Sequence, residues 1–492
     1  MANPAITHAE IRMYRMGTGD CFIVKLFAGQ KESFKLMIDC GTWQGTKAHL
    51  DPFIQDLKAY VNNEVDLLVV THEHKDHVYG FEVCQDVFKQ GFNIRKIWMG
   101  WTEDDKNKKV ATWKKDYGEK KKALSLAADK VKDALEDLRY KAQFTSEHNG
   151  SAMFAAREKF SQVLSGLAEL QVSVQNGQYK GMLEGTRIVK EELATDNIQY
   201  FRPGDIVENL ENAPGVRFYV LGPPLMWEDV KAEAGGKGES YQHNKELGDS
   251  DAFSAAVLNY TAAGAPASII PFDQKFVLPD PASSIPALYG KSENAWRKID
   301  FEWLYSAGSL ALRANSLTNN LSLALAIEFT ESGRVLLFPG DAEYGSWASW
   351  HTIKWPHKGR DGRRHLTEDL LNRTVFYKVA HHLSHNGTAQ RLGLQMMTHS
   401  DLAAMATLDY NIISNGWKNT MPNRALLKDL LNQTKGRLMI MSESDLFFDL
   451  LDEVPLHNKI TEARSKMSTE ENKAFNTSFI EQKLYLQYRV KA

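Results

Sequence analysis

The chain has 492 residues, 43% of them hydrophobic and 25% charged, and its 59 Lys and Arg against 62 Asp and Glu give a formal net charge of −3. This length allows a large core and about two to three average domains, or one elaborated catalytic domain. The near-zero charge excludes a global basic field for nucleic acid. With three cysteines, no signal peptide and no apolar run long enough for a bilayer, we expect a cytoplasmic protein with no membrane partner.

Three strand-like segments open the chain. Glu10–Tyr14 and Cys21–Leu26 flank the segment Gly17-Thr18-Gly19-Asp20, whose two glycines predict a tight hairpin. The third segment, 34–38, ends at Asp39. An acid at such a strand end can orient a histidine of a neighbouring loop. Helix-like spacing of apolar residues follows at 52–61 and again at 80–89.

The most informative stretch follows an apolar, strand-like run at 65–70. It reads Thr71-His72-Glu73-His74-Lys75-Asp76-His77. On extended backbone His72 and His74 point the same way and can bind one ion, while Asp76 and His77 stand where a turn can aim them at a second. Imidazole together with carboxylate favours zinc, manganese or iron over calcium or magnesium. A single histidine would fit an ordinary exposed loop, but three with an aspartate predict a metal site.

Composition then divides the chain. We expect 1–102 and 200–492 to form one α/β domain, interrupted at 103–199 by an insertion that lacks proline and carries helical stripes. The lysine clusters of this insertion fit solvated helix faces better than phosphate contacts. A region at about 227–286, with scattered glycine and proline, has the irregular character of a lid or binding loop.

Two later strand ends add candidate ligands. A hairpin around 331–333 leads to Gly340-Asp341, where one carboxylate can give an oxygen to each ion of a pair about 3.5–4 Å apart. The strand at 375–380 ends in histidines, of which His381 is our choice as final ligand. His382 is then a candidate for substrate contact or proton donation, and the choice between the two histidines stays open. Six of the 15 histidines fall within 71–77 and 375–388.

The C-terminal part continues as α/β sequence. A helix is expected at 423–431 because its leucines recur at helical spacing. Strands are expected at 404–414, 438–441 and 485–490, and we expect them to complete the second sheet.

The H-x-H-x-D-H pattern resembles the signature of the metallo-β-lactamase superfamily. That resemblance implies an αββα sandwich with a metal site at one edge of its two sheets. The segments Asn319-Asn320-x-Ser322-Leu323, Lys378-Val379-x-His381-His382-x-Ser384 and Gly17-x-Gly19-Asp20 are similar to the hydrolase branch of the DNA-uptake channel protein of competent bacteria and its soluble relatives. Asn320 stands where many members have a metal-binding histidine, and Tyr79 and Leu383 stand where glycine is usual.

The resemblance implies a metal-dependent hydrolase with a dinuclear site of two divalent ions, Zn²⁺ most readily and Mn²⁺ next. The ligands would be His72, His74, Asp76, His77, Asp341 and His381, with Asp76 and His382 in catalytic roles. A phosphodiester substrate is favoured, including single-stranded nucleic acid, which makes the protein a phosphodiesterase or nuclease. The alternatives are a thioester, lactone or lactam hydrolase, and a non-catalytic, metal-stabilised protein that binds a protein partner through its helical insertion.

Overall fold

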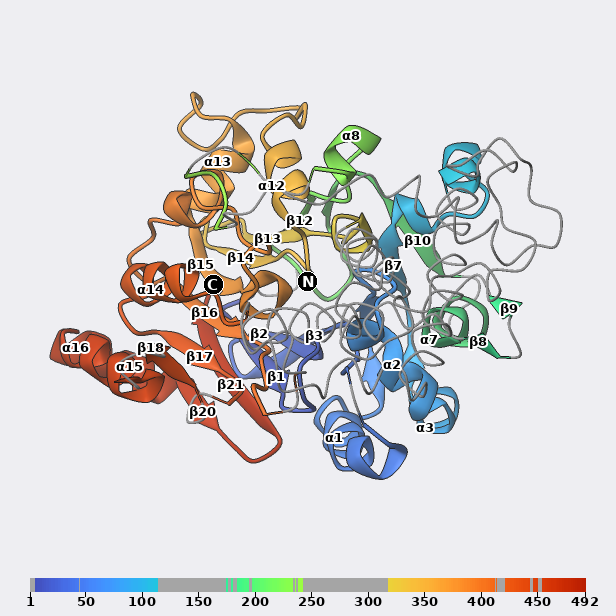
Figure 1. The fold of residues 1–492 in the computed structure, drawn as a ribbon, viewed down its shortest axis with the longest axis horizontal. Coiled ribbons are helices and arrows are strands. Elements are labelled where there is room, and N and C mark those ends of the chain that lie inside the picture. Colours follow the sequence, from blue (N-terminus) through green and yellow to red (C-terminus); the bar gives the residue numbers. More distant parts are fainter. Residues whose placement is uncertain are drawn as a thin grey trace, which may run out of the picture.

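The computed structural model describes residues 5–113 except 44, the pairs 174–175 and 178–179, 184–241 with gaps at 194–196, 233–234 and 236–237, 317–449 with gaps at 412, 414–420 and 443–445, and 454–492. Within these residues, two sheets of eight and seven strands form the centre of the molecule, and helices lie on either side (Figure 1). The predicted α/β class is therefore confirmed.

The first sheet combines an antiparallel half with a parallel half. Its order is β10 (Ile198–Phe201), β7 (Ile97–Gly100), β5 (Leu67–Val69), β3 (Lys31–Ile38), β2 (Phe22–Ala28), β1 (His8–Tyr14), β21 (Tyr485–Lys491) and β20 (Phe479–Glu481). Strands β3, β5, β7 and β10 run parallel, and the other pairs are antiparallel. The predicted hairpin between the first two strands is confirmed, because β1 pairs with β2 in antiparallel register.

The place of the last strand corrects the prediction that it completes the second sheet. Strand β21 lies in the first sheet between β1 and β20, and Tyr488 pairs with Ile11. The alternating pattern of β21 identifies a strand with one buried face, but it does not identify a partner that lies more than four hundred residues away in the chain.

The second sheet is antiparallel at one end and parallel at the other. Its order is β11 (Ile206–Glu208), β12 (Val216–Val220), β13 (Leu325–Phe329), β14 (Val335–Phe338), β15 (Thr374–Lys378), β16 (Ala403–Ala406) and β17 (Leu438–Ile440). The predicted hairpin around 331–333 joins β13 to β14. From β14 to β17 the strands are parallel, so their carboxyl ends reach one edge of the sheet together.

The two sheets share an apolar core. Phe22 of β2 meets Phe338 of β14 edge to face, with ring centroids 5.9 Å apart, and both belong to a cluster of buried side chains from the two sheets. Full burial of one such side chain contributes about 1.5–3 kcal/mol. Two further apolar clusters lie on the outer faces, each between a sheet and its helices.

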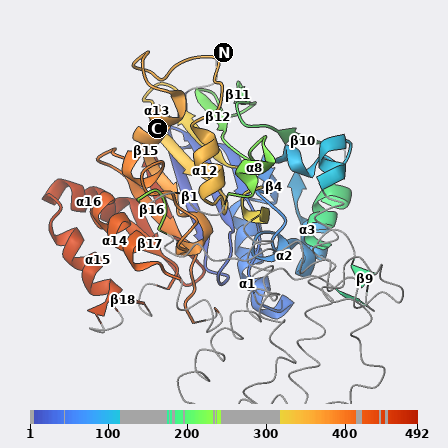
Figure 2. The ribbon, with the colours of Figure 1, turned by 45° about the horizontal axis from the view of Figure 1, so that its top comes forward.

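The helices cover the outer faces. The first sheet carries α1 (Lys47–Tyr60), α2 (Lys75–Val83) and α3 (Gln85–Gly91), and the second carries α12 (Tyr344–Trp350), α13 (Leu366–Asn372), α14 (Arg424–Gln433) and α15 (Leu456–Ser465). Figures 1 and 2 show these two groups on opposite sides of the strands. Helix α2 begins at Lys75, earlier than predicted, so that Asp76 and His77 lie in its first turn.

The remaining elements are short. They are β4 (Glu64–Val65) with β6 (Asn93–Ile94), β8 (Val174–Gln175) with β9 (Gln178–Tyr179), β18 (Phe447–Asp449) with β19 (Val454–Pro455), α7 (Glu184–Ile188), α8 (Trp227–Val230), α16 (Thr469–Ser478), and tight or wide helical turns at Trp101–Glu103, Val189–Leu193, Ala380–Leu383 and Leu394–Met396. Most of the predicted insertion at 103–199, and the predicted irregular region beyond residue 241, lie outside the described residues.

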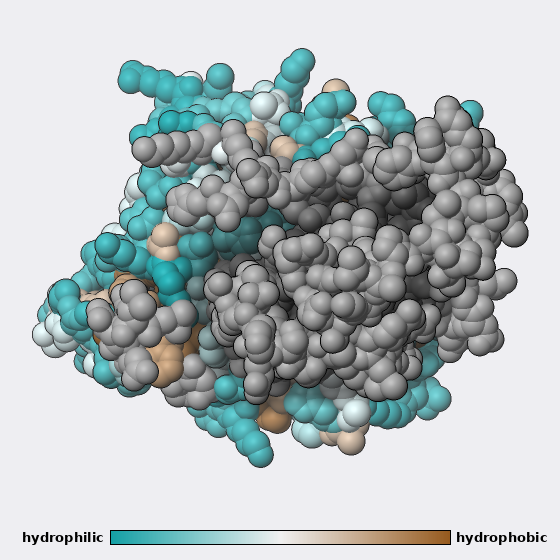
Figure 3. Space-filling view, in the orientation of Figure 1, coloured by the Kyte–Doolittle hydropathy of each residue, from teal (hydrophilic) through white to brown (hydrophobic). Residues whose placement is uncertain are grey.

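The described surface is mainly hydrophilic in the view of Figure 3. The large hydrophobic side chains exposed among the described residues are Leu225, Met226, Phe447 and Ile480. No helix in the described part of the chain combines the length and the apolar character needed to cross a membrane.

Candidate metal centre

The predicted site residues gather where strand ends of both sheets meet. The 72–77 segment follows β5, Asp341 follows β14, and His382 follows β15. The backbone joins the two sheets at this edge, because the amide of Leu323 donates to the carbonyl of Thr71 at 2.8 Å. Side chains about three hundred residues apart in the chain are thereby brought together.

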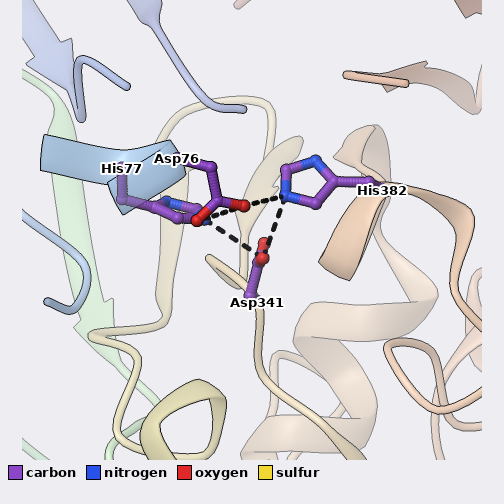
Figure 4. Close-up of side chains that lie close together, drawn as sticks. All are labelled: Asp76, His77, Asp341 and His382. Carbon is purple, nitrogen blue, oxygen red and sulfur yellow. Dashed lines mark hydrogen bonds and ion pairs between the residues drawn. The ribbon is translucent and has the colours of Figure 1, made fainter. Parts of the chain in front are cut away.

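Four buried side chains converge on one point, and we call them the four-donor group: Asp76, His77, Asp341 and His382 (Figure 4). Oδ2 of Asp341 lies 3.1 Å from Nε2 of His77 and 3.1 Å from Nε2 of His382. Oδ2 of Asp76 lies 2.9 Å from Nε2 of His382 and 3.9 Å from Nε2 of His77.

These distances match the coordination shell of a small divalent ion. Zinc bonds of 2.0–2.1 Å in a tetrahedron place neighbouring ligand atoms about 3.3 Å apart. The four contacts between 2.9 and 3.9 Å bracket that value. In addition, Nε2 of His77 and Oδ2 of Asp341 are fully buried and make no hydrogen bond with other described residues. Buried polar atoms without partners are rare, and here an ion would satisfy both. The residues therefore fit a metal ion.

His77 is oriented by Asp39, as the sequence predicts. Nδ1 of His77 donates to Oδ2 of Asp39 at 2.7 Å, so Nε2 is turned toward the four-donor group. Asp39 also accepts from the amide of Thr71 at 2.8 Å and from its hydroxyl at 2.6 Å. These bonds hold Asp39 at φ +55°, in the left-handed region that non-glycine residues seldom adopt.

His382 is oriented by Thr407 of its own sheet, which is held in turn by Asp20 of the first sheet. The hydroxyl of Thr407, directly after β16, donates to Oδ1 of Asp20 at 2.7 Å. That hydroxyl is 2.7 Å from Nδ1 of His382, so it accepts the Nδ1–H and turns Nε2 toward the four-donor group. Asp20 belongs to the predicted Gly17–Asp20 hairpin, which thereby acquires a role in the site.

A left-handed turn selects between the two neighbouring histidines. His381, His382 and Leu383 have φ values of +47°, +49° and +66°. Left-handed backbone costs roughly 1–2 kcal/mol per non-glycine residue. The amide of His381 donates to Oδ1 of Asp341 at 3.2 Å, and the carbonyl of Leu383 accepts from the amide of Asn423 at 2.8 Å, which helps to hold the turn. The turn brings His382, rather than His381, into the four-donor group.

Asp341 is held by a buried lysine. Nζ of Lys378 donates to Oδ1 of Asp341 at 2.9 Å and to the carbonyl of Gly340 at 2.9 Å, and it also forms an ion pair with Asp20. Oδ1 of Asp341 is therefore engaged by Lys378 and by the amide of His381, and only Oδ2 faces the histidines. The expectation that Asp341 gives one oxygen to each of two ions does not match this geometry.

Asp76 is fixed by an indole. Nε1 of Trp43 donates to Oδ2 of Asp76 at 2.8 Å, and the Trp43 ring lies edge-on to the His382 ring, with centroids 6.3 Å apart. The backbone approaches closely here: a Cβ on Gly41 would lie 2.1 Å from the carbonyl carbon of Asp76. Glycine at position 41 is thus required for the first turn of α2 to reach the site.

His72 and His74 form a separate pair beside the four-donor group. Nε2 of His72 lies 3.1 Å from Nδ1 of His74, close to the separation expected for two nitrogens on one ion. Nδ1 of His72 lies 3.0 Å from the hydroxyl of Thr71 and 3.2 Å from that of Ser322. The hydroxyl of Ser322 also accepts from the amide of Asp341 at 3.1 Å, which connects the pair to the four-donor group.

His381 and the two asparagines lie in an adjoining polar cluster. Nε2 of His381 is 3.3 Å from Nδ2 of Asn319, and Nδ1 of His381 is 3.3 Å from Glu343. Oδ1 of Asn320 accepts from the amides of Glu343 and Ser346, so it caps α12. Asn320 therefore does not occupy the place of the missing histidine ligand.

The buried carboxylates and histidines of the four-donor group shift each other's pKa values. Burial opposes a charged imidazole, yet the carboxylates of Asp341 and Asp76 raise the pKa of His382 to about 10, and Asp341 and Asp39 raise the pKa of His77. Against the same burial, these histidines and Lys378 lower the pKa of Asp341. Burial and the neighbouring His77 instead lower the pKa of His72. The carboxylates of the four-donor group therefore favour positive charge on its two histidines.

Sequence reasoning missed three supports of this group: Lys378, Thr407 and Trp43. Lys378 had a detectable signal, because a lysine at the end of an otherwise apolar strand needs a buried partner. Thr407 and Trp43 carry no such signal, since threonine after a strand and tryptophan in a loop are both common.

Comparisons with models of protein families, with curated protein sequences and with solved structures found no match to this chain. The chemistry of the site is therefore inferred from its own side chains.

Proposed function

We propose that the chain is a metal-dependent hydrolase with the metallo-β-lactamase fold, and that its substrate is a phosphodiester. The observation that carries the proposal is the four-donor group, in which each histidine is tied through Nδ1 and both Nε2 atoms point at two carboxylate oxygens. The two facing sheets with helices outside them, and the site at the edge where their strands end, support the fold assignment.

Asp76, His77, Asp341 and His382 would hold one ion, and His72 and His74 would hold a second. When bound, zinc or manganese supplies Lewis acidity and lowers the pKa of water toward neutrality. The chain's own contribution is to fix the ligands: Asp39 and Thr407 set the histidine tautomers, and Lys378 restricts Asp341 to one oxygen.

The unequal ligand count supports catalysis over a purely structural role. A structural zinc site is usually closed by four protein ligands, whereas a catalytic site keeps a position open. The four-donor group offers four ligands, but the His72–His74 pair offers two imidazole nitrogens. Water and substrate would then complete the shell of an ion held by His72 and His74, and Asp76 would orient the attacking water.

Phosphodiester hydrolysis is favoured because a pair of ions suits in-line displacement at phosphorus by holding both the attacking and the leaving oxygen. Single-stranded nucleic acid belongs to this class of substrate. A protein partner bound through the insertion is also proposed, and the residues concerned lie largely outside those described.

Hydrolysis of bis(p-nitrophenyl) phosphate by the zinc- or manganese-loaded chain tests the proposal. We expect turnover that is lost in the double variant His72→Ala, His74→Ala and kept in His457→Ala, a matched change at an exposed histidine. Release of thiol from a thioester without diester turnover would assign the site to acyl substrates instead. Equal inertness of the wild type and the double variant toward both substrates would overturn the hydrolase proposal.

A further inference from the structure

Lys75 occupies a place that a structural lysine rarely takes. It is the first residue of α2, where the helix dipole favours acids, and it directly precedes Asp76 and His77. The side chain is half-buried, and its ammonium lies 4.0 Å from the centre of the Tyr79 ring. Glu82 and Asp76 act electrostatically on Lys75, and no ion pair joins Lys75 to another described residue. A half-buried ammonium at this position can attract an anion to the start of α2.

Two aromatic rings lie close to Lys75 and Asp76: Tyr79 beneath the Lys75 ammonium, and Trp43 on the Asp76 carboxylate. Trp43 and Tyr79 are each partly exposed, and each is pinned by its polar tip. The Trp43 N–H donates to Asp76 at 2.8 Å, and the Tyr79 hydroxyl donates to the carbonyl of Gly45 at 3.3 Å. Because the tips are held, the ring faces keep fixed orientations, which lowers the entropy cost of stacking a flat ligand on them.

We propose that Lys75, Tyr79 and Trp43 form a subsite for a nucleotide: a phosphate on the ammonium, and a base against an aromatic face. The subsite rests on the proposed function and specifies its substrate as a nucleic acid or nucleotide. Lysine is a common point-charge partner for phosphate. Aromatic faces accept any base, because every base presents a π surface. The position of Trp43 beside the His382 ring places this subsite next to the four-donor group.

Binding of deoxythymidine 5′-monophosphate to the zinc-loaded full chain, measured by calorimetry, tests the subsite without requiring turnover. We expect Lys75→Gln to weaken this binding about tenfold, the scale of one charge-assisted hydrogen bond, and to leave binding of thymidine unchanged. Tyr79→Leu should weaken binding of both the nucleotide and thymidine several-fold. Trp43 is left intact in the test because its N–H also holds Asp76.

Matched controls lie on remote elements. Lys428→Gln changes an exposed lysine of α14, and Phe447→Leu changes an exposed aromatic of β18; neither should alter nucleotide binding by more than twofold. Circular dichroism and urea unfolding of Lys75→Gln and Tyr79→Leu verify that each variant is folded.

The outcomes separate the subsite from the hydrolase. Nucleotide affinity within twofold of wild type in Lys75→Gln overturns the subsite, whatever the fate of bis(p-nitrophenyl) phosphate. Equal affinity for glycerol phosphate and the nucleotide, unaffected by Tyr79→Leu, also overturns it, since the ligand would then be a phosphate without a base. If nucleotide binding depends on Lys75 but the chain hydrolyses no diester, the subsite proposal is supported and the hydrolase proposal is contradicted.

Discussion

The four-donor group and the His72–His74 pair differ in the side chains that hold their ligands in place. In the four-donor group every ligand has a second partner: Asp39 on His77, Thr407 on His382, Lys378 on Asp341 and Trp43 on Asp76. Nδ1 of His72 lies beside the hydroxyls of Thr71 and Ser322, and among the described residues no carboxylate contacts that nitrogen. We therefore expect a divalent ion to bind more tightly to the four-donor group than to His72 and His74.

The largest effect should come from removing a ligand of the four-donor group. We expect His382→Asn to lower zinc affinity more than about 100-fold, because loss of a ligand exceeds the 10–100-fold cost of losing an outer partner. The neighbouring change His381→Asn should cost less than about tenfold, since His381 lies outside the four-donor group. Competition with a chromophoric chelator measures both affinities. The reverse order would make His381 the ligand and contradict the assignment.

The next effect concerns stability. Lys378→Met leaves Asp20 and Asp341 buried beside each other without their shared cation, so the free energy of unfolding of the metal-free chain should fall by about 3–5 kcal/mol. Urea denaturation measures the change. Lys428→Met, at an exposed position, should stay within about 0.5 kcal/mol of wild type. A similar decrease in the free energy of unfolding in both variants would show that Lys378 does not stabilise the four-donor group.

Removing the side chains that orient the ligands should affect the four-donor group and the His72–His74 pair differently. Asp39→Asn should weaken the first equivalent of zinc 10–100-fold, because it disturbs the tautomer and position of His77. Ser322→Ala, which removes a hydroxyl near His72, should act mainly on the second equivalent and by about tenfold at most. Titration calorimetry resolves the first and second equivalents of zinc. If both variants weaken the same equivalent, the proposal of two separate sites is contradicted.

The smallest signal is the number of protons released. At neutral pH the raised pKa values of His77 and His382 keep both rings protonated in the metal-free chain, so the first zinc should displace about two protons. Its affinity should therefore rise with pH and level off near the pKa of His382, about 10. The lowered pKa of His72 makes that ring neutral, and it should contribute no proton to the second equivalent. Calorimetry in buffers of different ionisation enthalpy counts the protons.

Much of this centre could be read from the sequence, because its ligands follow apolar strands and strand ends are where a sheet presents side chains. The 72–77 spacing, Asp341 after its Gly and the orienting role of Asp39 all follow from local pattern. The choice of His382 over His381 does not, because it depends on three left-handed residues, and Leu383 offers none of the freedom by which glycine would signal such a turn.

For the fold as well, local sequence predicts single elements and not their arrangement. Individual strands and helices are visible in the periodicity of their apolar residues, and the hairpins are visible in their glycines. Which strand adjoins which is not, as β21 shows: its pattern fits either sheet, and its place beside β1 depends on an edge formed at the other end of the sequence.

That placement of β21 has a consequence for how the molecule is made. The sheet that carries His72 to His77 has β21 as an inner strand, and the amide of Ala492 donates to the carbonyl of Thr7 at 2.9 Å. During synthesis on the ribosome, β1 would present an unpaired edge until residues 485–491 emerge, and such edges invite pairing with other chains. We therefore expect the first sheet to be complete, and β1 to be protected from such pairing, only once residues 485–491 have paired with it.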